Sequence, residues 1–272
     1  MTIWTKALID NYDRFKEMVD AGALVFVNHS GGKDSMAMYE VIAPLVPEEN
    51  LVVIHADLGD EVEWAGVKDH IRDNIDGRPL EIARAIYKDG TDKNLLDYVE
   101  RRGMWPSSAA RYCTSDLKRG PIEKVIRRIA KERGKTLIVD CIGYRSEESP
   151  ARAKLSAWKH DEKNSKAGRT WIKFSPILDL TEADVWRIID GAGKKRHWAY
   201  DKGMKRLSCV FCVLAGENDL RTAAKLAPPE LVKRYTDLEK KIGHTFKNGK
   251  SLAEIIEPPN DLAGLPLFDL AA

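Results

Sequence analysis

The chain has 272 residues, of which 43% are hydrophobic and 32% charged, and its formal net charge is +2. This length suits one domain with an appended subdomain or two small domains, and the composition argues against disorder. No apolar run approaches the roughly 20 residues that a membrane span needs, and the N-terminal residues lack a signal-peptide core. We therefore expect a cytoplasmic protein without membrane contact.

Short apolar runs alternate with amphipathic stretches along the first half of the chain. Unbroken apolar runs are typical of strands buried on both faces, and apolar residues at helical spacing predict helices. The predicted strands are 23–27, 51–54, 80–83 and 136–139, and the predicted helices are 6–20, 34–45, 61–75, 94–101 and 121–133. This alternation predicts the α/β class, with a Rossmann-like, mostly parallel sheet flanked by helices.

The character of the sequence changes after about residue 150. Residues 151–170 are rich in Lys, Arg and small residues, and we expect a mobile loop that can act as a lid. Thr181-Glu182-Ala183-Asp184 predicts a helix start of the capping-box type. Residues 216–242 predict helices interrupted at Pro228-Pro229, and the tail after Pro258 is expected to lie over the surface.

The hexapeptide Ser30-Gly31-Gly32-Lys33-Asp34-Ser35 stands between the first predicted strand and its helix. Glycines at this point let the backbone approach a ligand closely, and a helix start attracts phosphate through its free N–H groups and its dipole. Lys33 adds a positive charge, and the two serines add hydroxyl donors. The spacing differs from that of the Walker A loop and of the G-x-G-x-x-G motif. An ordinary turn with a surface lysine is the alternative to a phosphate site.

The hexapeptide resembles the PP-loop of the ATP pyrophosphatases, also called adenine nucleotide alpha hydrolases. Further segments within residues 23–215 are similar, in the same order, to motifs of the phosphoadenosine-phosphosulfate (PAPS) reductase family. They are His55-Ala56-Asp57-Leu58-Gly59-Asp60-Glu61, Cys113-Thr114-Ser115-Asp116-Leu117-Lys118-Arg119-Gly120-Pro121, Gly143-Tyr144-Arg145-Ser146-Glu147-Glu148-Ser149-Pro150-Ala151-Arg152, and Pro176-Ile177-Leu178-Asp179 with Asp184-Val185-Trp186. The resemblance implies a PP-loop nucleotide-binding α/β domain over 1–180 and a helical C-terminal region with a C-x-x-C pair over 181–272.

Basic side chains in these segments are candidates for binding phosphate or sulfate. Arg145 and Arg152 can clamp such oxygens with their guanidinium forks, or they can simply pair with Glu147 and Glu148 at the surface. Lys118 can neutralise a phosphate, or it can be solvated at a helix start. We expect catalytic roles for Lys33, Lys118 and Arg145.

The remaining nucleotide contacts follow from the resemblance. His55 and Asp57 end the second predicted strand, and Gly143 precedes Arg145. Asp34 and Asp57 can hold Mg²⁺, which binds through one or two carboxylates and substrate phosphates, or Asp34 can only cap its helix. The expected nucleotide-binding set is Ser30, Gly31, Gly32, Lys33, Asp34, Ser35, His55, Asp57, Gly143, Arg145 and Arg152.

Cys209 and Cys212 form a C-x-x-C pair, a pattern that fits zinc, an iron–sulfur cluster or a redox disulfide. Beside Cys113, the pair resembles the iron–sulfur pattern of the adenylylsulfate reductase branch, although Tyr112 stands where that branch has a further cysteine. The three cysteines predict a [4Fe–4S] cluster, with zinc as the second choice and inert thiols as the third. Cys141 ends a predicted strand and is expected to be a small buried hydrophobic residue.

Two departures from the reductases bear on the reaction. Those enzymes keep a catalytic cysteine in a C-terminal tail, whereas no cysteine follows Cys212 in this sequence. Their loop also departs from Ser-Gly-Gly-Lys-Asp-Ser, because their nucleotide has no pyrophosphate tail. We therefore expect ATP to be cleaved to AMP and pyrophosphate so that an acceptor is activated for sulfur transfer, the acceptor being a DNA phosphate, an RNA base or sulfate.

Two alternatives remain open from the sequence. One is a PAPS or adenylylsulfate reductase that forms sulfite with an external thiol, for example from a thioredoxin-like partner. The other is a non-catalytic nucleotide-binding subunit of an oligomer. The basic runs Lys118-Arg119, Arg127-Arg128 and Lys194-Lys195-Arg196 can contact a nucleic acid or can be solvated helix faces, and a sulfur-donor partner is compatible with the leading hypothesis.

Overall fold

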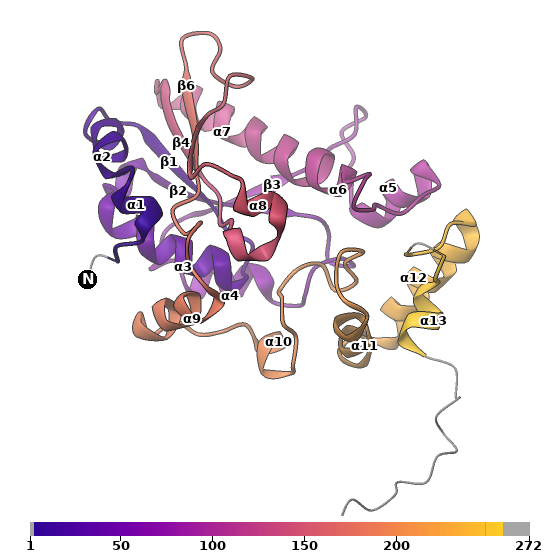
Figure 1. Cartoon of the computed structure of the whole chain (residues 1–272). Helices are drawn as coiled ribbons and strands as arrows, with labels where there is room; N and C mark the ends of the chain where they lie inside the picture. The colour runs from indigo at the N-terminus through magenta and orange to yellow at the C-terminus, as the bar shows by residue number, and fades with distance from the viewer. Residues whose placement is uncertain (1–2, 248, 258–272) are drawn as a thin grey trace, which may run out of the picture.

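The computed structural model describes residues 3–247 and 249–257. A six-stranded sheet with the strand order β3-β2-β1-β4-β6-β5 lies at its centre (Figure 1). The first three strands are β1 (Leu24–Asn28), β2 (Leu51–Asp57) and β3 (Leu80–Arg84), and they run parallel to β4 (Leu137–Cys141) and β6 (Thr170–Phe174). Strand β5 (Trp158–His160) is antiparallel to β6. The predicted α/β class and mostly parallel sheet are confirmed.

Helices cover both faces of this sheet (Figure 1). The N-terminal half contains α1 (Lys6–Ile9), α2 (Tyr12–Asp20), α3 (Lys33–Ile42), α4 (Val67–Asp73), α5 (Leu95–Arg102), α6 (Tyr112–Thr114) and α7 (Gly120–Glu132). The C-terminal half contains α8 (Pro150–Ala153), α9 (Glu182–Gly191), α10 (Trp198–Asp201), α11 (Glu217–Leu226), α12 (Pro229–Ile242) and α13 (Leu252–Ile256).

The alternation of side chains along the strands divides the core between the two faces. On one face, Ile126 and Ile129 of α7 pack against Phe26 and Ile54 of the central strands. On the other face, the intervening strand residues pack against α1 to α4 and the C-terminal helices in one larger cluster. Helix α9 packs outside α3 through Val185 and is therefore one layer further from the sheet.

Two predicted helices differ from the observed ones in their bounds. The predicted helix over 6–20 is broken into α1 and α2, and Asn11, between them, donates its side-chain amide to the Ala7 carbonyl. The helix predicted from residue 61 begins only at Val67, because Gly66 before it has a φ of +77° that a continuing helix does not tolerate.

The segment 151–170, predicted as a mobile loop, is irregular over most of its length but includes short regular elements. It contains α8 and the edge strand β5, and it leads into β6, which the sequence analysis missed. Some of the polar residues that suggested a loop form ion pairs and hydrogen bonds. Asp161 forms an ion pair with Lys173 at 2.6 Å and accepts a hydrogen bond from the side chain of Asn164.

A π-helical turn, Ser115–Arg119, joins α6 to α7. Pro121 has no N–H group and cannot donate to the carbonyl four residues earlier, which favours a locally widened helix before it. The turn carries Lys118 and begins two residues after Cys113. The predicted helix over 121–133 is thus confirmed but is preceded by two further turns.

The helices of the C-terminal half largely follow the predictions. The Thr181 side chain caps α9 in a capping box with Asp184, and the break at Pro228-Pro229 separates α11 from α12. The predicted surface position of the tail after Pro258 lies outside the described residues. None of the helices in residues 3–247 and 249–257 is both long enough and apolar enough to cross a membrane.

Candidate functional site

The PP-loop (residues 30–35) connects the carboxyl end of β1 to the start of α3. Gly31 has a φ of +78°, and a Cβ atom there would come within 2.7 Å of Val67 Cγ2 on α4. Only glycine fits this position, because the backbone conformation and the space both exclude a side chain. Because the loop follows the carboxyl end of β1, it lies at the edge of the parallel sheet where α/β proteins bind ligands.

Short-range hydrogen bonds hold the loop in a curled shape. The N–H of Ser30 donates to Ser35 Oγ at 3.1 Å, and the N–H of Gly31 donates to His29 Nδ1 at 3.1 Å. The N–H of Gly32 lies 3.4 Å from Ser30 Oγ. Successive N–H groups curled in this way form the kind of concave surface that binds anions.

Lys33 is buried, with 3% of its surface exposed, so the alternative of a turn with a surface lysine is wrong. Its Nζ donates to the Lys205 carbonyl at 3.0 Å and lies 3.8 Å from the Glu182 carboxylate. A buried ammonium is stable only when it is paired or hydrogen-bonded. The charge of Lys33 is therefore directed into the interior of the site.

Arg145 and Gly143 lie against the start of α3. Arg145 is buried, and its Nε donates to Asp34 Oδ1 at 2.6 Å while its Nη1 lies 3.1 Å from Glu147. A Cβ atom on Gly143 would come within 3.2 Å of the Asp34 carbonyl. The structure thus brings the segment after β4 into contact with the PP-loop, as the motif order predicts.

Arg152 lies on α8. It pairs with Glu148 and stacks on the Tyr144 ring, with its guanidinium carbon 4.4 Å from the ring centroid. Burial lowers the pKa of Arg152. Its pairing with Glu148 matches the alternative that the sequence left open for this residue.

His55 and Asp57 extend from the end of β2. The imidazole of His55 lies 2.9 Å from the His29 carbonyl and 3.1 Å from Glu63. Burial acts to raise the pKa of Asp57, but the Gly59 N–H, Arg84 and Lys68 outweigh it and hold the pKa below its usual value. Arg84 donates to Asp57 at 2.7 and 2.9 Å, so this carboxylate is neutralised by protein cations and fits Mg²⁺ poorly. Asp34 pairs with one protein cation, Arg145, whereas Asp57 pairs with two, Arg84 and Lys68.

Cys113, Cys209 and Cys212 (the thiol trio) lie around Lys118. Burial acts to lower the pKa of Lys118, but its interactions with Cys209, Cys212 and Cys113 outweigh the burial and raise the pKa. Burial raises the pKa of Cys209 to about 12, although Lys118 opposes the shift. The three cysteines are partly exposed. They lie close enough to influence the pKa of Cys209 and of Lys118.

The thiol trio was also expected to hold a [4Fe–4S] cluster or zinc. Within the described residues, no group of three or more His, Cys, Asp or Glu side chains is arranged so that it could hold a metal ion. As they are placed here, Cys113, Cys209 and Cys212 therefore do not form a ligand set, and the metal centre stays a prediction.

Three histidines near the PP-loop were missed by the sequence analysis. His29 and His197 are buried and His70 is half-buried, and the rings of His70 and His197 lie 5.1 Å apart. In the part of the chain that the structure describes, the Nε2 atom of each has no hydrogen-bond partner. The three residues come from distant segments and share no spacing, so no pattern in the sequence marks them.

Two hollows are formed by other parts of the chain. The larger, of about 670 Å³, is lined by residues of α4, the end of β3 and the α11–α12 corner, together with Glu63, Trp198 and Val210. Its volume is in the range of small-molecule sites. Val210 stands between the two cysteines of the C-x-x-C pair, so this hollow borders the thiol trio.

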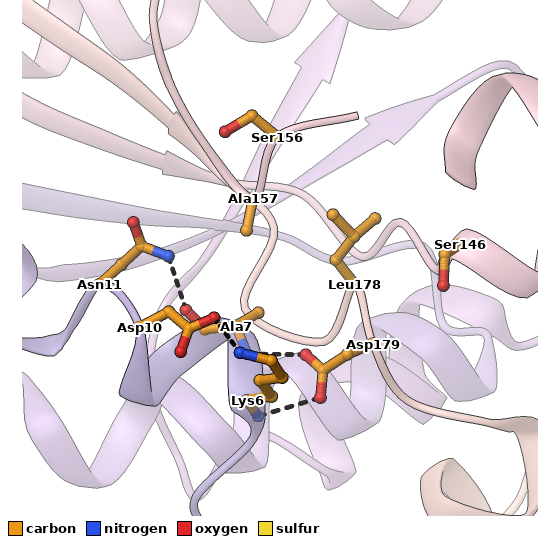
Figure 2. Close-up of a pocket in the computed structure, with 9 residues that line it drawn as sticks. All are labelled: Lys6, Ala7, Asp10, Asn11, Ser146, Ser156, Ala157, Leu178 and Asp179. Atoms are coloured by element: carbon orange, nitrogen blue, oxygen red, sulfur yellow. Dashed lines mark hydrogen bonds and ion pairs between the residues drawn. The ribbon is translucent and has the colours of Figure 1, made fainter. Parts of the chain in front are cut away.

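Figure 2 shows the second hollow, which lies between α1 and the segment after β6. Its carboxylate Asp179 accepts hydrogen bonds from the backbone N–H groups of Lys6 at 2.9 Å and Ala7 at 2.7 Å. These contacts anchor the start of α1. The Pro176-Ile177-Leu178-Asp179 segment thus has a structural role, and no residue of the PP-loop lines this hollow.

Comparisons with known proteins bear on this arrangement. Residues 24–215 match the family model described as phosphoadenosine phosphosulfate reductase domain. An uncharacterized 37.8 kDa protein in the gpa 5′ region of Escherichia phage 186 is 30% identical over 161 residues, which are 59% of this chain and 47% of that protein. The matched part of this chain thus spans about half the length of that relative.

A solved structure is also similar. The crystal structure of phosphoadenylyl-sulfate (PAPS) reductase from Candida auris, in a phosphate complex, aligns with a TM-score of 0.47 and 18% sequence identity. The alignment covers 77% of this chain and 98% of that chain.

Proposed function

The chain belongs to the phosphoadenosine phosphosulfate reductase domain family, and from this premise we propose that it cleaves ATP to AMP and pyrophosphate to activate an acceptor for sulfur transfer. The family supports a nucleotide-binding enzyme. The observation that carries the choice of ATP is the complete PP-loop with a buried Lys33, because a buried ammonium at a helix start suits the multiple charges of a pyrophosphate tail.

In the proposed reaction, Lys33 and the N-terminus of α3 bind the β- and γ-phosphates. An oxygen of the acceptor attacks the α-phosphorus, and a new oxygen–phosphorus bond forms. The bond from the α-phosphorus to the bridging oxygen breaks, and its electron pair leaves with pyrophosphate. Lys33 and the α3 N-terminus stabilise the charge that develops on this leaving group.

Arg145 and Asp34 complete the proposed phosphate site. Their ion pair at 2.6 Å holds the guanidinium beside the loop, where its free N–H groups can contact an α-phosphate oxygen. Asp34 is the carboxylate that we propose for Mg²⁺, since one or two carboxylates with substrate phosphates are its usual protein ligands. Magnesium would supply charge neutralisation on the phosphates.

The thiol trio supports sulfur transfer as the second half of the reaction. Hydrosulfide would attack the activated acceptor and form the new bond to sulfur, and AMP would leave with the electron pair of the bond that breaks. The role assigned to Lys118 is to stabilise the anionic sulfur, and the influence of the three cysteines on its pKa supports this assignment. The larger hollow borders Val210 and Glu63 and offers room for the acceptor. Iron and sulfide assays on protein purified without oxygen test the separate prediction of a cluster.

The test of ATP cleavage is to mix the protein, Mg²⁺ and ATP with candidate acceptors and to measure pyrophosphate release. Lys33→Ala is expected to reduce the rate by roughly 100-fold or more, because it removes a charge from the transition state. Lys16→Ala is the matched control, since Lys16 is exposed and pairs only with Asp20 on α2. The proposal fails if wild-type protein neither releases pyrophosphate nor binds ATP, and Lys33→Ala behaves like wild type.

A second candidate function is favoured by the family match itself. Reduction of PAPS or adenylylsulfate to sulfite is the activity for which the family is named, and it would need a thiol from a separate donor because no cysteine follows Cys212 in the sequence. Labelled sulfite formed from the labelled nucleotide, in the presence of thioredoxin or glutathione, would select this function over ATP cleavage.

A further inference from the structure

The position on the PP-loop where a phosphate group would bind is occupied by another part of the chain. The Tyr200 hydroxyl accepts a hydrogen bond from the backbone N–H of Lys33 at 2.9 Å, at the position where a phosphate oxygen would meet the start of α3. The carbonyl of Lys205 accepts from Lys33 Nζ at 3.0 Å. Two neutral oxygen atoms therefore take the places of phosphate oxygens.

Leu207 closes the remaining space over the two glycines. A Cβ atom on Gly31 would lie 3.3 Å from Leu207 Cδ2, and one on Gly32 would lie 3.2 Å from the Leu207 carbonyl. The Leu207 N–H also lies 3.3 Å from the Tyr200 hydroxyl. A phosphate group does not fit between this segment and the loop, so the two must compete for the same place.

The segment that covers the PP-loop is short, and several of its residues are exposed. We call residues 198–207 the gate segment. It consists of the four-residue helix α10 and an irregular turn, and residues 201–203, 205 and 206 are exposed. Ala199, Met204 and Leu207 anchor the segment to the hydrophobic core, so it opens by a local motion, which costs less free energy than global unfolding. Phosphate oxygens form stronger hydrogen bonds to an ammonium than the neutral Lys205 carbonyl does, so phosphate is the better ligand for Lys33.

We propose that the gate segment closes the PP-loop when nucleotide is absent, and that the pyrophosphate group of the nucleotide displaces it. The inference rests on the proposed function for the identity of the ligand. Leu207 is two residues before Cys209, so displacement of the gate segment also moves Cys209 relative to Cys113, which lies on the separate α6 helix. Nucleotide binding thereby changes the arrangement of the thiol trio.

Trypsin cleavage tests the gate directly. The carbonyl that Lys33 Nζ holds is that of the Lys205–Arg206 peptide bond, which trypsin must attack to cut after Lys205. Native wild-type protein is treated with trypsin, with and without inorganic pyrophosphate or MgATP, and each cleavage is followed by mass spectrometry. Binding of the ligand to the same protein is measured by calorimetry.

Pyrophosphate is expected to accelerate cleavage after Lys205 by roughly tenfold, because the hydrogen bonds that protect this peptide are lost. Cleavage after the exposed Lys166, in a distant turn, is expected to stay unchanged and serves as the internal control. A ligand that only stabilised the closed protein would slow the cleavage after Lys205.

Tyr200→Phe tests the gate without any ligand. It removes the hydroxyl that accepts from Lys33 and Leu207, and cleavage after Lys205 is expected to rise by roughly tenfold in the free protein. Tyr12→Phe is the matched control, because Tyr12 packs on Trp4 at the far end of the chain.

The gate is overturned if Tyr200→Phe leaves the cleavage rate within twofold of wild type. It is also overturned if pyrophosphate binds to wild-type protein but does not accelerate cleavage after Lys205. Either result leaves the proposed ATP cleavage standing. Conversely, a faster Tyr200→Phe cleavage in a protein that releases no pyrophosphate from ATP supports the gate and rejects the function.

Discussion

Burial of imidazoles beside the PP-loop makes the folded protein sensitive to acid. Burial, reinforced by the neighbouring His55, His70 and Lys194, lowers the pKa of His29 to about 3, and burial likewise lowers the pKa of His197 to about 4. Both rings are neutral in the folded state near pH 7. Their Nδ1 atoms accept hydrogen bonds from Gly31 and Ala199, so protonation would break these contacts.

We expect His29→Asn to reduce the loss of stability in acid. A depressed pKa in the folded state means that the unfolded chain binds the proton first, so stability is present above pH 6.5 and is lost as the pH falls toward 3. For His29 the loss between pH 6.5 and pH 5 is roughly 1.5 kcal/mol. Asparagine offers an oxygen close to the position of Nδ1 and keeps an acceptor for the Gly31 N–H. Urea unfolding at several pH values measures how steeply the free energy of unfolding changes with pH.

The control for this experiment is His244→Asn, because His244 is exposed in the C-terminal half of the chain. The pH slope of this variant should match that of wild type. If the stability of His29→Asn changes with pH as steeply as that of wild type and of His244→Asn, the acid sensitivity arises elsewhere and the role assigned to His29 is wrong.

At the residue scale, the sequence predicted the polar groups of the loop but not their partners. The spacing of Ser30 to Ser35 and the segment around Arg145 are local patterns, and the structure brings them together. The hydroxyl of Tyr200 and the carbonyl of Lys205 come from positions 167 and 172 residues away from Lys33. No local pattern marks a residue whose role is to fill a distant site, so these contacts could only come from the structure.

At the scale of elements, α9 tests whether a capping box read from the sequence stabilises its helix. Thr181 accepts from the Asp184 N–H, and the Asp184 carboxylate accepts from the Thr181 N–H at 2.9 Å. We expect Thr181→Ala to lower the free energy of unfolding by about 1 kcal/mol, because it removes the N-cap acceptor. Thermal or urea unfolding measures the change.

Thr236→Ala is the matched control, since Thr236 lies inside α12 and its hydroxyl bonds back to the Lys233 carbonyl of its own helix. Alanine there should leave stability unchanged or raise it slightly, because alanine is the better helix former. Equal losses in the two variants would contradict the capping role of Thr181.

The elements that were predicted well are those whose sequence pattern matches their burial. Strands β1, β2 and β4 are buried on both faces and appear as unbroken apolar runs. Strand β5 was missed because it is short and lies at the sheet edge, and β6, between β4 and β5, was missed because Lys173 interrupts its apolar residues. The position of β6 depends on its pairing with β4 and β5 and on the ion pair between Lys173 and Asp161, which are not local in the sequence.

For the whole molecule, the predicted division at residues 180 and 181 cuts through a shared hydrophobic core. One cluster of buried residues extends from Leu8 near the N-terminus to Ile255 in α13. Trp105 connects its two parts, because the ring stacks on Tyr235 of α12 at 5.5 Å and meets Phe246 edge-on at 5.0 Å. This continuity leads us to propose that the two regions unfold together.

Trp105→Ala is expected to lower the free energy of unfolding by roughly 3–5 kcal/mol, because it removes a large buried aromatic side chain between the two regions. Urea unfolding of wild-type protein should show coincident transitions by circular dichroism and by tryptophan fluorescence, as a two-state protein does. Trp4→Ala is the control, since Trp4 is 51% exposed and its loss should matter little. Two separate unfolding transitions in wild type would mean that the C-terminal helices fold independently. An effect of Trp105→Ala on only the transition at higher urea concentration would mean the same. The gate segment would then link two independent units, whereas a single transition makes it a mobile part of one cooperative structure.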